Sequence, residues 1–179
     1  SFSDRSENRA IYSVYDIRTD IRPTIAEVNL GALRRNVDAL RARLDGQDVI
    51  ATEQESPASV TAAATAGEGE QTGIMAVLKA DAYGHGAVMC AQAVARQVWG
   101  FAVSLVEEGV ELRRAGLVEQ PIVVLGCYYG LSHRDVVAYR LTPVVADARD
   151  LVRFARAAVD LGAPRVPVHV KIDTGMSRL

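Results

Sequence analysis

Short apolar runs alternate with helical stripes of apolar residues between residues 74 and 170. Each run is bounded by glycine, proline or polar residues and is too short for a helix, which is typical of a strand. The five runs cover residues 74–78, 100–103, 121–125, 142–146 and 166–170. Because these runs are apolar on both faces, we expect them to form a parallel sheet that is buried on both sides.

Helical patterns fill the segments between these predicted strands. They cover residues 86–98, 104–116, a short stretch that starts at Ser132 and Asp135, and 147–162. Ser104 and Glu107 have the spacing of a capping box, and Asp147 is a suitable N-cap for the last helix. A glycine-rich turn is expected before the first helix, between residues 79 and 86.

Strands and helices in this order predict an α/β fold, and both a doubly wound sheet and a (β/α)₈ barrel fit the pattern. No GxGxxG motif follows a predicted strand, which counts against a dinucleotide site. A complete barrel needs eight strands and about 250 residues. This chain has 179 residues and five predicted strands, so we expect it to be the front part of a longer protein.

The first 73 residues divide into three parts. Residues 1–22 are polar and charged without a period, and we interpret them as an N-terminal arm. Residues 23–30 alternate like a strand and end at Asn29, which can cap a following helix. The apolar stripe of that helix is Leu30, Leu33, Val37, Leu40 and Leu44. Residues 46–72 have few large apolar side chains, so we predict an inserted surface loop, or else a linker between domains.

Composition excludes several classes of protein. Hydrophobic residues make up 49% of the chain, which is enough for a packed core, and the net charge of −2 argues against a nucleic-acid partner. The apolar runs are far shorter than the roughly 18 residues of a membrane helix, and the polar start lacks a secretory segment. Cys90 and Cys127 have no metal-ligand spacing and make no disulfide framework. We therefore expect a cytoplasmic globular protein with no metal, nucleic-acid or membrane partner.

The two lysines stand out among the basic residues. Only two of the 20 basic residues are lysines, namely Lys79 and Lys171. Each of them directly follows a predicted strand. Arginine does not lose its proton in proteins, whereas a buried lysine can become a neutral nucleophile. Because reactive groups gather at the carboxyl ends of parallel strands, this placement predicts amine chemistry at one edge of the sheet. The alternative is chance in an arginine-rich chain, with lysines that extend from strand ends to water.

The segment after Lys79 could hold an anion. Gly84 and Gly86 allow a ligand to approach the backbone, and Tyr83 could donate its hydroxyl group to that anion. The helix that starts near residue 86 adds the positive end of its dipole. A lysine beside a phosphate-sized site suits an enzyme with an imine-forming cofactor. We interpret His85 as a turn residue.

The segment after Lys171 carries a second set of candidate groups. Arg178 has a planar fork that suits a carboxylate or phenolate oxygen. Asp173 is expected to stabilise a turn or cap a helix. His169 shares a predicted strand face with Lys171, as a buried structural residue or as a support for the site. Residues 127–129 could line the same site, but packing is the favoured interpretation.

Three segments of the chain resemble the alanine racemase family. Residues 76–86 (AVLKADAYGHG) resemble the cofactor-lysine motif of the family, and residues 168–179 (VHVKIDTGMSRL) resemble its second motif. Residues 22–36 (RPTIAEVNLGALRRN) resemble its opening segment. The resemblance therefore covers residues 22–179 apart from the insert at 46–72, which the family lacks.

The resemblance implies a fold-type III pyridoxal-phosphate enzyme, with an N-terminal (β/α)₈ barrel and a C-terminal β domain. Residues 23–179 would then be a partial TIM-like barrel, truncated after about five strands, without the remaining strands and the β domain. Lys79 would bind pyridoxal 5′-phosphate as an aldimine and act as the base on one face. Tyr83 would contact the phosphate, and Arg178 would contact the phenolic oxygen and the substrate carboxylate. Lys171 matches a lysine that is carbamylated in many members and would pair with Arg178.

The implied activity is the racemisation of L-alanine and D-alanine, which supplies D-alanine for peptidoglycan. The family also implies a homodimer, because the base on the second face comes from a partner subunit, so this piece is expected to be incomplete for activity. One alternative is a racemase with broader specificity that also accepts serine. Another is a non-catalytic pyridoxal-phosphate-binding homeostasis protein with the same barrel.

Overall fold

The computed structural model describes residues 9–13, 25–46, 72–126, 128–175 and 177, and within them it contains two sheets. The smaller sheet pairs β1 (Arg9–Ser13) with β2 (Ile25–Asn29) in antiparallel orientation. The larger sheet is parallel, and its strands are β3 (Met75–Val77), β4 (Gly100–Val103), β5 (Ile122–Val124), β6 (Thr142–Val145) and β7 (His169–Val170). All five predicted strands of the α/β pattern are therefore confirmed.

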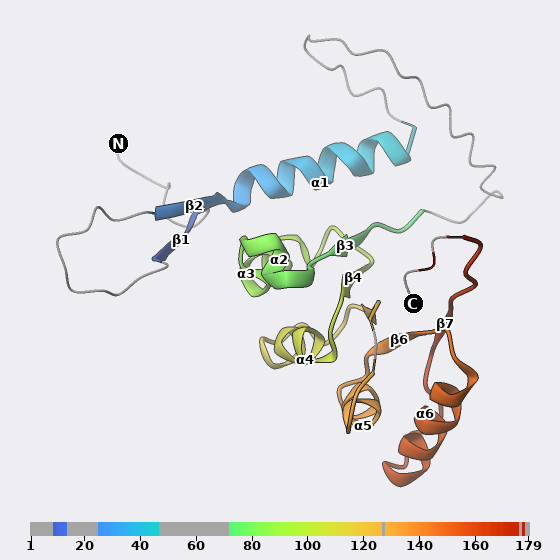
Figure 1. The fold of residues 1–179 in the computed structure, drawn as a ribbon. Helices are drawn as coiled ribbons and strands as arrows, with labels where there is room; N and C mark the ends of the chain where they lie inside the picture. The colour runs from blue at the N-terminus through green and yellow to red at the C-terminus, as the bar shows by residue number, and fades with distance from the viewer. Residues whose placement is uncertain (1–8, 14–24, 47–71, 127, 176, 178–179) are drawn as a thin grey trace, which may run out of the picture.

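The strand order distinguishes between the two architectures that the sequence leaves open. The strands of the parallel sheet lie side by side in chain order, from β3 to β7, with no reversal. The helices between them are α3 (Ala87–Val94), α4 (Val106–Arg114), α5 (Ser132–Ala138) and α6 (Ala148–Asp160). Each of these helices contacts the next one, and Figure 1 shows them following one another along the strands. A doubly wound sheet reverses its strand order and places helices on both faces, so the arrangement is that of a partial barrel.

Helix α1 (Leu30–Leu44) begins as the sequence predicts and packs against α3. The side chain of Asn29 accepts a hydrogen bond from the backbone N–H of Ala32 at 2.9 Å, as an N-cap does. The predicted apolar stripe is buried only in part. Leu30 and Val37 are buried, whereas Leu40 and Leu44 near the end of the helix are about half exposed.

The N-terminal arm predicted for residues 1–22 contains an element that the sequence analysis missed. Residues 9–13 form β1, and Arg9 pairs with Asn29 while Ser13 pairs with Ile25. The physical reason is that β2 alone would leave a row of backbone donors and acceptors unpaired, and an antiparallel neighbour satisfies them. The insert predicted at 46–72 lies almost wholly outside the described residues.

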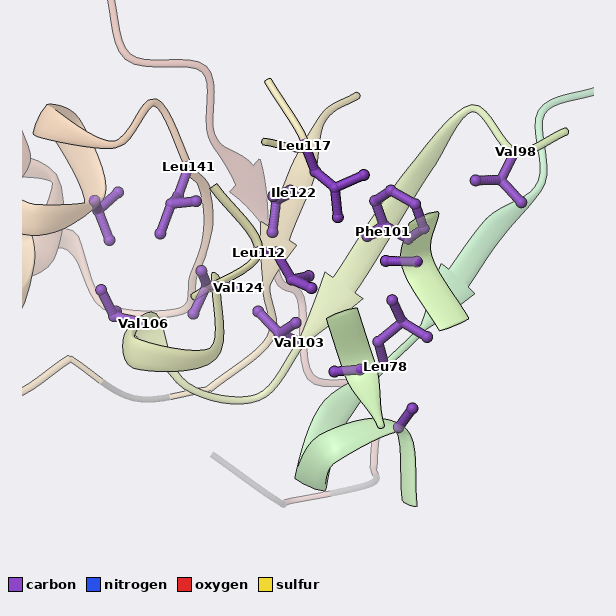
Figure 2. Packing of buried hydrophobic residues seen from close by; sticks show 14 of the residues in the cluster. Leu78, Val98, Phe101, Val103, Val106, Leu112, Leu117, Ile122, Val124 and Leu141 are labelled. Atoms are coloured by element: carbon purple, nitrogen blue, oxygen red, sulfur yellow. The ribbon is translucent and has the colours of Figure 1, made fainter. Parts of the chain in front are cut away.

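The core lies between the parallel sheet and its helices. Phe101, Ile122 and Val124 of β4 and β5 are fully buried, and Figure 2 shows them close to Leu112 of α4. The expectation of strands buried on both faces is confirmed for β4 and β5. It is wrong for β7, whose two residues are exposed, and for β3, which is half-buried and ends at the exposed Val77. These are the two end strands of the described sheet, and each has a neighbour on one side only.

Helix α4 starts one residue later than the capping-box prediction requires. Its N-cap is Leu105 and not Ser104, so the acidic residue three positions on is Glu108 and not Glu107. The carboxylate of Glu108 accepts hydrogen bonds from the backbone N–H groups of Ser104 at 2.8 Å and Leu105 at 3.0 Å. The glutamate half of a capping box is therefore present, and leucine cannot supply the other half.

Candidate functional site

Both lysines lie at the carboxyl ends of strands of the same parallel sheet. The backbone N–H of Leu78, just before Lys79, donates to Ala102 of β4 at 2.8 Å, and that of Lys171 donates to Val145 of β6 at 2.9 Å. Because all five strands run in one direction, Lys79 and Lys171 share one edge of the sheet, as predicted. Both side chains are half-buried. At about 4.8 Å for each strand, the two lysines are about 19 Å apart along the sheet before its curvature is considered.

Directly after Lys79 the chain forms one left-handed turn, labelled α2 (Lys79–Gly84) in Figure 1. Ala80, Asp81, Ala82 and Tyr83 have φ angles between 52° and 58°, and none of them is glycine. A left-handed residue with a side chain costs roughly 1–2 kcal/mol, so the four together cost about 4–8 kcal/mol. The sequence predicts a glycine-rich turn here, and no local pattern in it indicates this strain.

Hydrogen bonds to the surrounding structure hold the turn in this conformation. The backbone N–H of Ala80 donates to Glu108 Oε1 of α4 at 2.7 Å. At the other end, Asp81 Oδ1 accepts from the backbone N–H of Ala87 at 2.6 Å, at the start of α3. The backbone N–H of Ala82 donates to Leu78 at 2.9 Å. A strained backbone persists only where its surroundings determine it in this way, and such backbones cluster at functional sites.

The turn places Tyr83 beside Lys79. Lys79 Nζ lies 5.7 Å from the centre of the Tyr83 ring, and this ring is 61% exposed. The structure therefore brings together two of the predicted site residues, an amine and a phenol, at the open edge of the sheet. His85 ends the turn, and its Nδ1 lies 2.8 Å from the carbonyl oxygen of Ala82, which confirms its interpretation as a turn residue.

The structure confirms one prediction about the residues around Lys171 and contradicts another. Asp173 Oδ1 accepts from the backbone N–H groups of Gly175 at 2.9 Å and Ser177 at 3.1 Å, so the prediction of a turn residue is confirmed. His169 is exposed on β7, and the expectation of a buried structural histidine is wrong. Arg178 lies outside the described residues.

Tyr128 packs against the protein, as the favoured interpretation predicts, whereas Tyr129 is 73% exposed and the prediction of packing is wrong for it. The hydroxyl group of Tyr128 lies 2.9 Å from the carbonyl oxygen of Val144, and its ring makes an edge contact with Phe154. The sequence analysis missed the partner in this cluster, His133, which is 7% exposed and bonded to Asp150 at 2.9 Å. Cys127 lies outside the described residues.

A hollow of about 490 Å³ lies between α1, β2 and β3. Asn29, Asn36, Ala82 and His85 are among the residues that line it, but Lys79 and Tyr83 are not. Cys90 also lines it, and burial, followed by the negative charge of Asp81, raises the pKa of this thiol. A thiol of raised pKa is a poor nucleophile, so the candidate reactive group remains the amine of Lys79.

The described residues contain neither a cluster of metal-binding side chains nor a helix that could span a membrane. No three side chains of His, Cys, Asp or Glu gather there in a way that could hold a metal ion. None of the helices in this part of the chain has both the length and the apolar character that crossing a bilayer requires.

Comparisons with known proteins agree with this geometry. The family model described as the alanine racemase N-terminal domain matches residues 58–179. An alanine racemase of Sorangium cellulosum is 41% identical over 163 residues, which cover 89% of this chain and 37% of that protein. Alanine racemase from Streptomyces coelicolor has a similar structure, with a TM-score of 0.64 and 31% identity over 83% of this chain and 33% of that one.

A second solved structure gives the same result. The alanine racemase of Clostridium difficile, in complex with cycloserine, has a TM-score of 0.57 and 38% identity over 60% of this chain and 29% of that one. The chain thus spans a little over a third of the length of the curated relatives it matches. The order of the strands, the lysine at the end of β3 and the match over residues 58–179 agree, and the chain belongs to the family of the alanine racemase N-terminal domain.

Proposed function

We propose that the protein carrying this chain is a pyridoxal-phosphate-dependent racemase that interconverts L-alanine and D-alanine. The observation that carries the proposal is the position of Lys79, a half-buried primary amine on a strained turn at the carboxyl edge of the sheet. Membership of the alanine racemase family supports the same reaction. The activity belongs to the complete protein, because this chain matches only part of each relative.

The residues around Lys79 suit pyridoxal phosphate. Lys79 supplies the primary amine that an aldehyde cofactor requires, and Tyr83 beside it supplies an exposed hydroxyl donor. A side chain built on Gly84 would meet no atom within 4 Å, so there is open space in front of the backbone there. An amine, a hydroxyl group and open space at one edge are what the cofactor needs.

Each residue has a defined task in this proposal. When bound, pyridoxal phosphate withdraws electrons from the α-carbon of an amino acid and makes its proton acidic. Lys79 Nζ, as a neutral amine, takes that proton on one face and returns one to the same face in the reverse direction. Tyr83 donates its hydroxyl hydrogen to the phosphate group. The planar fork of Arg178 binds the substrate carboxylate and the phenolic oxygen.

Lys171 is proposed to carry a carbamate. Its neutral amine forms a bond from Nζ to the carbon of CO₂ and releases one proton to water, so that a neutral group becomes an anion. That anion pairs with Arg178 and fixes the direction of its fork. Carbon-13 NMR of the complete protein with labelled bicarbonate tests this step, and the absence of a carbamate signal at Lys171 would contradict it.

The proposed setting follows from the same activity. The complete protein would act in the cytoplasm as a homodimer, in which the partner subunit supplies the base for the second face. Its product would supply D-alanine for peptidoglycan. Light scattering of the complete protein measures its oligomeric state, and comparison of kcat/KM for alanine and serine separates a strict racemase from a broad one.

Reduction with borohydride tests the role of Lys79. The complete protein is incubated with pyridoxal phosphate, reduced and digested, and the mass of the labelled peptide is measured. Residues 1–179 contain two lysines, so a label found in this part of the protein lies on Lys79 or on the internal control Lys171. We expect the label on Lys79 and exchange of the alanine α-proton in deuterated water. Lys79→Arg keeps the charge and should lose both, whereas binding without exchange would indicate a non-catalytic protein.

A further inference from the structure

Glu108 of α4 connects the lysine turn to the neighbouring strand and helix. Its carboxylate accepts three hydrogen bonds, all from backbone N–H groups. Oε2 accepts from Ser104 at 2.8 Å and Leu105 at 3.0 Å, where β4 gives way to α4. Oε1 accepts from Ala80 at 2.7 Å, 28 residues earlier in the sequence. One side chain therefore joins the carboxyl ends of β3 and β4.

The bond to Ala80 is placed where it can control Lys79. Ala80 follows Lys79 directly and is the first of the four left-handed residues. Without a fixed acceptor for its N–H group, the turn could relax towards the right-handed region that residues with side chains prefer. Such a relaxation would rotate Lys79 and move Tyr83, since both side chains leave the same short turn.

We propose that Glu108 is a positioning residue that fixes the direction of the Lys79 amine. The proposal rests on the proposed function, in which Lys79 binds the cofactor. Asp81 fixes the opposite end of the turn through the backbone N–H of Ala87 at 2.6 Å. The two carboxylates thus anchor the turn to α4 and to α3, and neither of them needs to touch the substrate.

Glu108→Gln separates this role from the ordinary role of a helix cap. A carboxylate has two acceptor oxygens, whereas an amide has one oxygen and an NH₂ group that only donates. Glutamine is accepted at this position of a capping box, so its oxygen can keep the bonds to Ser104 and Leu105. Its NH₂ group then faces the N–H of Ala80, and only the bond to the lysine turn is lost.

Hydrogen exchange of the cofactor-free complete protein gives the first measurement. We expect the protection of amides in residues 79–86 to fall about tenfold in Glu108→Gln, as for the loss of one charge-assisted bond, while amides in α4 keep theirs. Glu107→Gln is the matched control, because it removes the same charge from the exposed preceding residue. The positioning role would be overturned if residues 79–86 were equally protected in the wild type, Glu108→Gln and Glu107→Gln. It would also be overturned if α4 lost as much protection as residues 79–86 in Glu108→Gln.

Cofactor binding gives the second measurement. We expect Glu108→Gln to bind pyridoxal phosphate about tenfold more weakly and to form the borohydride-reducible bond to Lys79 more slowly, with a melting temperature that falls by only a few degrees. A wild-type protein that forms no such bond would overturn the proposed function and this role with it. A wild-type protein that forms the bond, beside a Glu108→Gln variant that forms it equally well, would overturn the role of Glu108 alone.

Discussion

Arg113, in the last turn of α4, offers a direct test of how the loops opposite the lysine edge are held. Its guanidinium donates to four carbonyl oxygens in two loops. Nη1 donates to Leu117 at 2.5 Å and Gln120 at 2.8 Å, Nε donates to Tyr139 at 3.0 Å, and Nη2 donates to Arg140 at 2.9 Å. The fork thus joins the loop before β5 to the loop before β6, and Arg113→Ala removes the whole connection.

The magnitude follows from these four bonds. A hydrogen bond to a charged group contributes roughly 1.5–3 kcal/mol, so four would give about 6–12 kcal/mol if all were shielded from water. Arg113 is only half-buried, and water can replace part of what is lost, so we expect about 3–4 kcal/mol. Burial, followed by the nearby charge of Arg140, lowers the pKa of Arg113.

Urea denaturation of the complete protein, followed by circular dichroism, measures this loss of free energy of unfolding. Arg114→Ala is the matched control, because this neighbour is exposed and contacts the single side chain of Tyr139, donating to its hydroxyl group at 2.9 Å and lying 5.5 Å from its ring centre, as far as the described residues show. We expect the control to lose less than about 1 kcal/mol. Arg113→Lys keeps the charge without the planar fork and should fall between the two. Losses for Arg113→Ala and Arg114→Ala within about 1 kcal/mol of each other would refute the reasoning.

Three further substitutions test other parts of the fold. Gly126→Ala would place a Cβ atom only 2.0 Å from the carbonyl oxygen of Ser104, so the loop after β5 must shift, and we expect a loss of at least about 2 kcal/mol in the same denaturation assay. Asn29→Ala removes the N-cap of α1 and should cost about 1 kcal/mol, whereas an unchanged midpoint would contradict the capping role. Asp147 caps α6, and its hydrogen bond to Arg149 lowers its pKa to about 2. Because that pKa is depressed, its contribution to stability is complete above about pH 4 and is lost as the pH falls through about 2. Amide exchange in α6 should show this pH dependence in the wild type, and Asp147→Asn should remove it.

The parts of the fold that follow from local patterns were predicted from the sequence. The runs that became β4 and β5 are apolar at every position, and burial between layers of side chains is the physical result. Lys79 and Lys171 could be placed on one edge because parallel strands share a direction, which needs no knowledge of contacts. Asn29 and Asp147 were recognised as caps because the backbone N–H group that a cap accepts from lies within three residues of it in the sequence.

The rest depends on contacts between residues that are distant in the sequence. Ala80 and Ala82 are good right-handed helix formers, so no local signal predicts a left-handed turn there. The acceptor that holds the turn, Glu108, lies 28 residues further on. The capping-box pattern selected Glu107 because Ser104 was the expected cap, but the helix starts after Leu105, and a shift of one residue exchanged the two glutamates. Strand β1 was missed for a similar reason, since its partner β2 follows a gap of 11 residues.

The strained turn makes the direction of the lysine depend on the packing of the barrel wall. Glu108 joins the turn to α4, and Asp81 joins it to α3. A change that moves either helix therefore also moves the turn. Gly109 shows how close this packing is, because a Cβ atom there would lie 2.9 Å from Cδ1 of Leu141, the residue before β6. A side chain at residue 109 would therefore force the buried side chain of Leu141 to shift, in the packing next to Glu108. The local preference of the sequence is violated at residues 80–83, and the tertiary structure that enforces the violation is the part of the core next to Lys79.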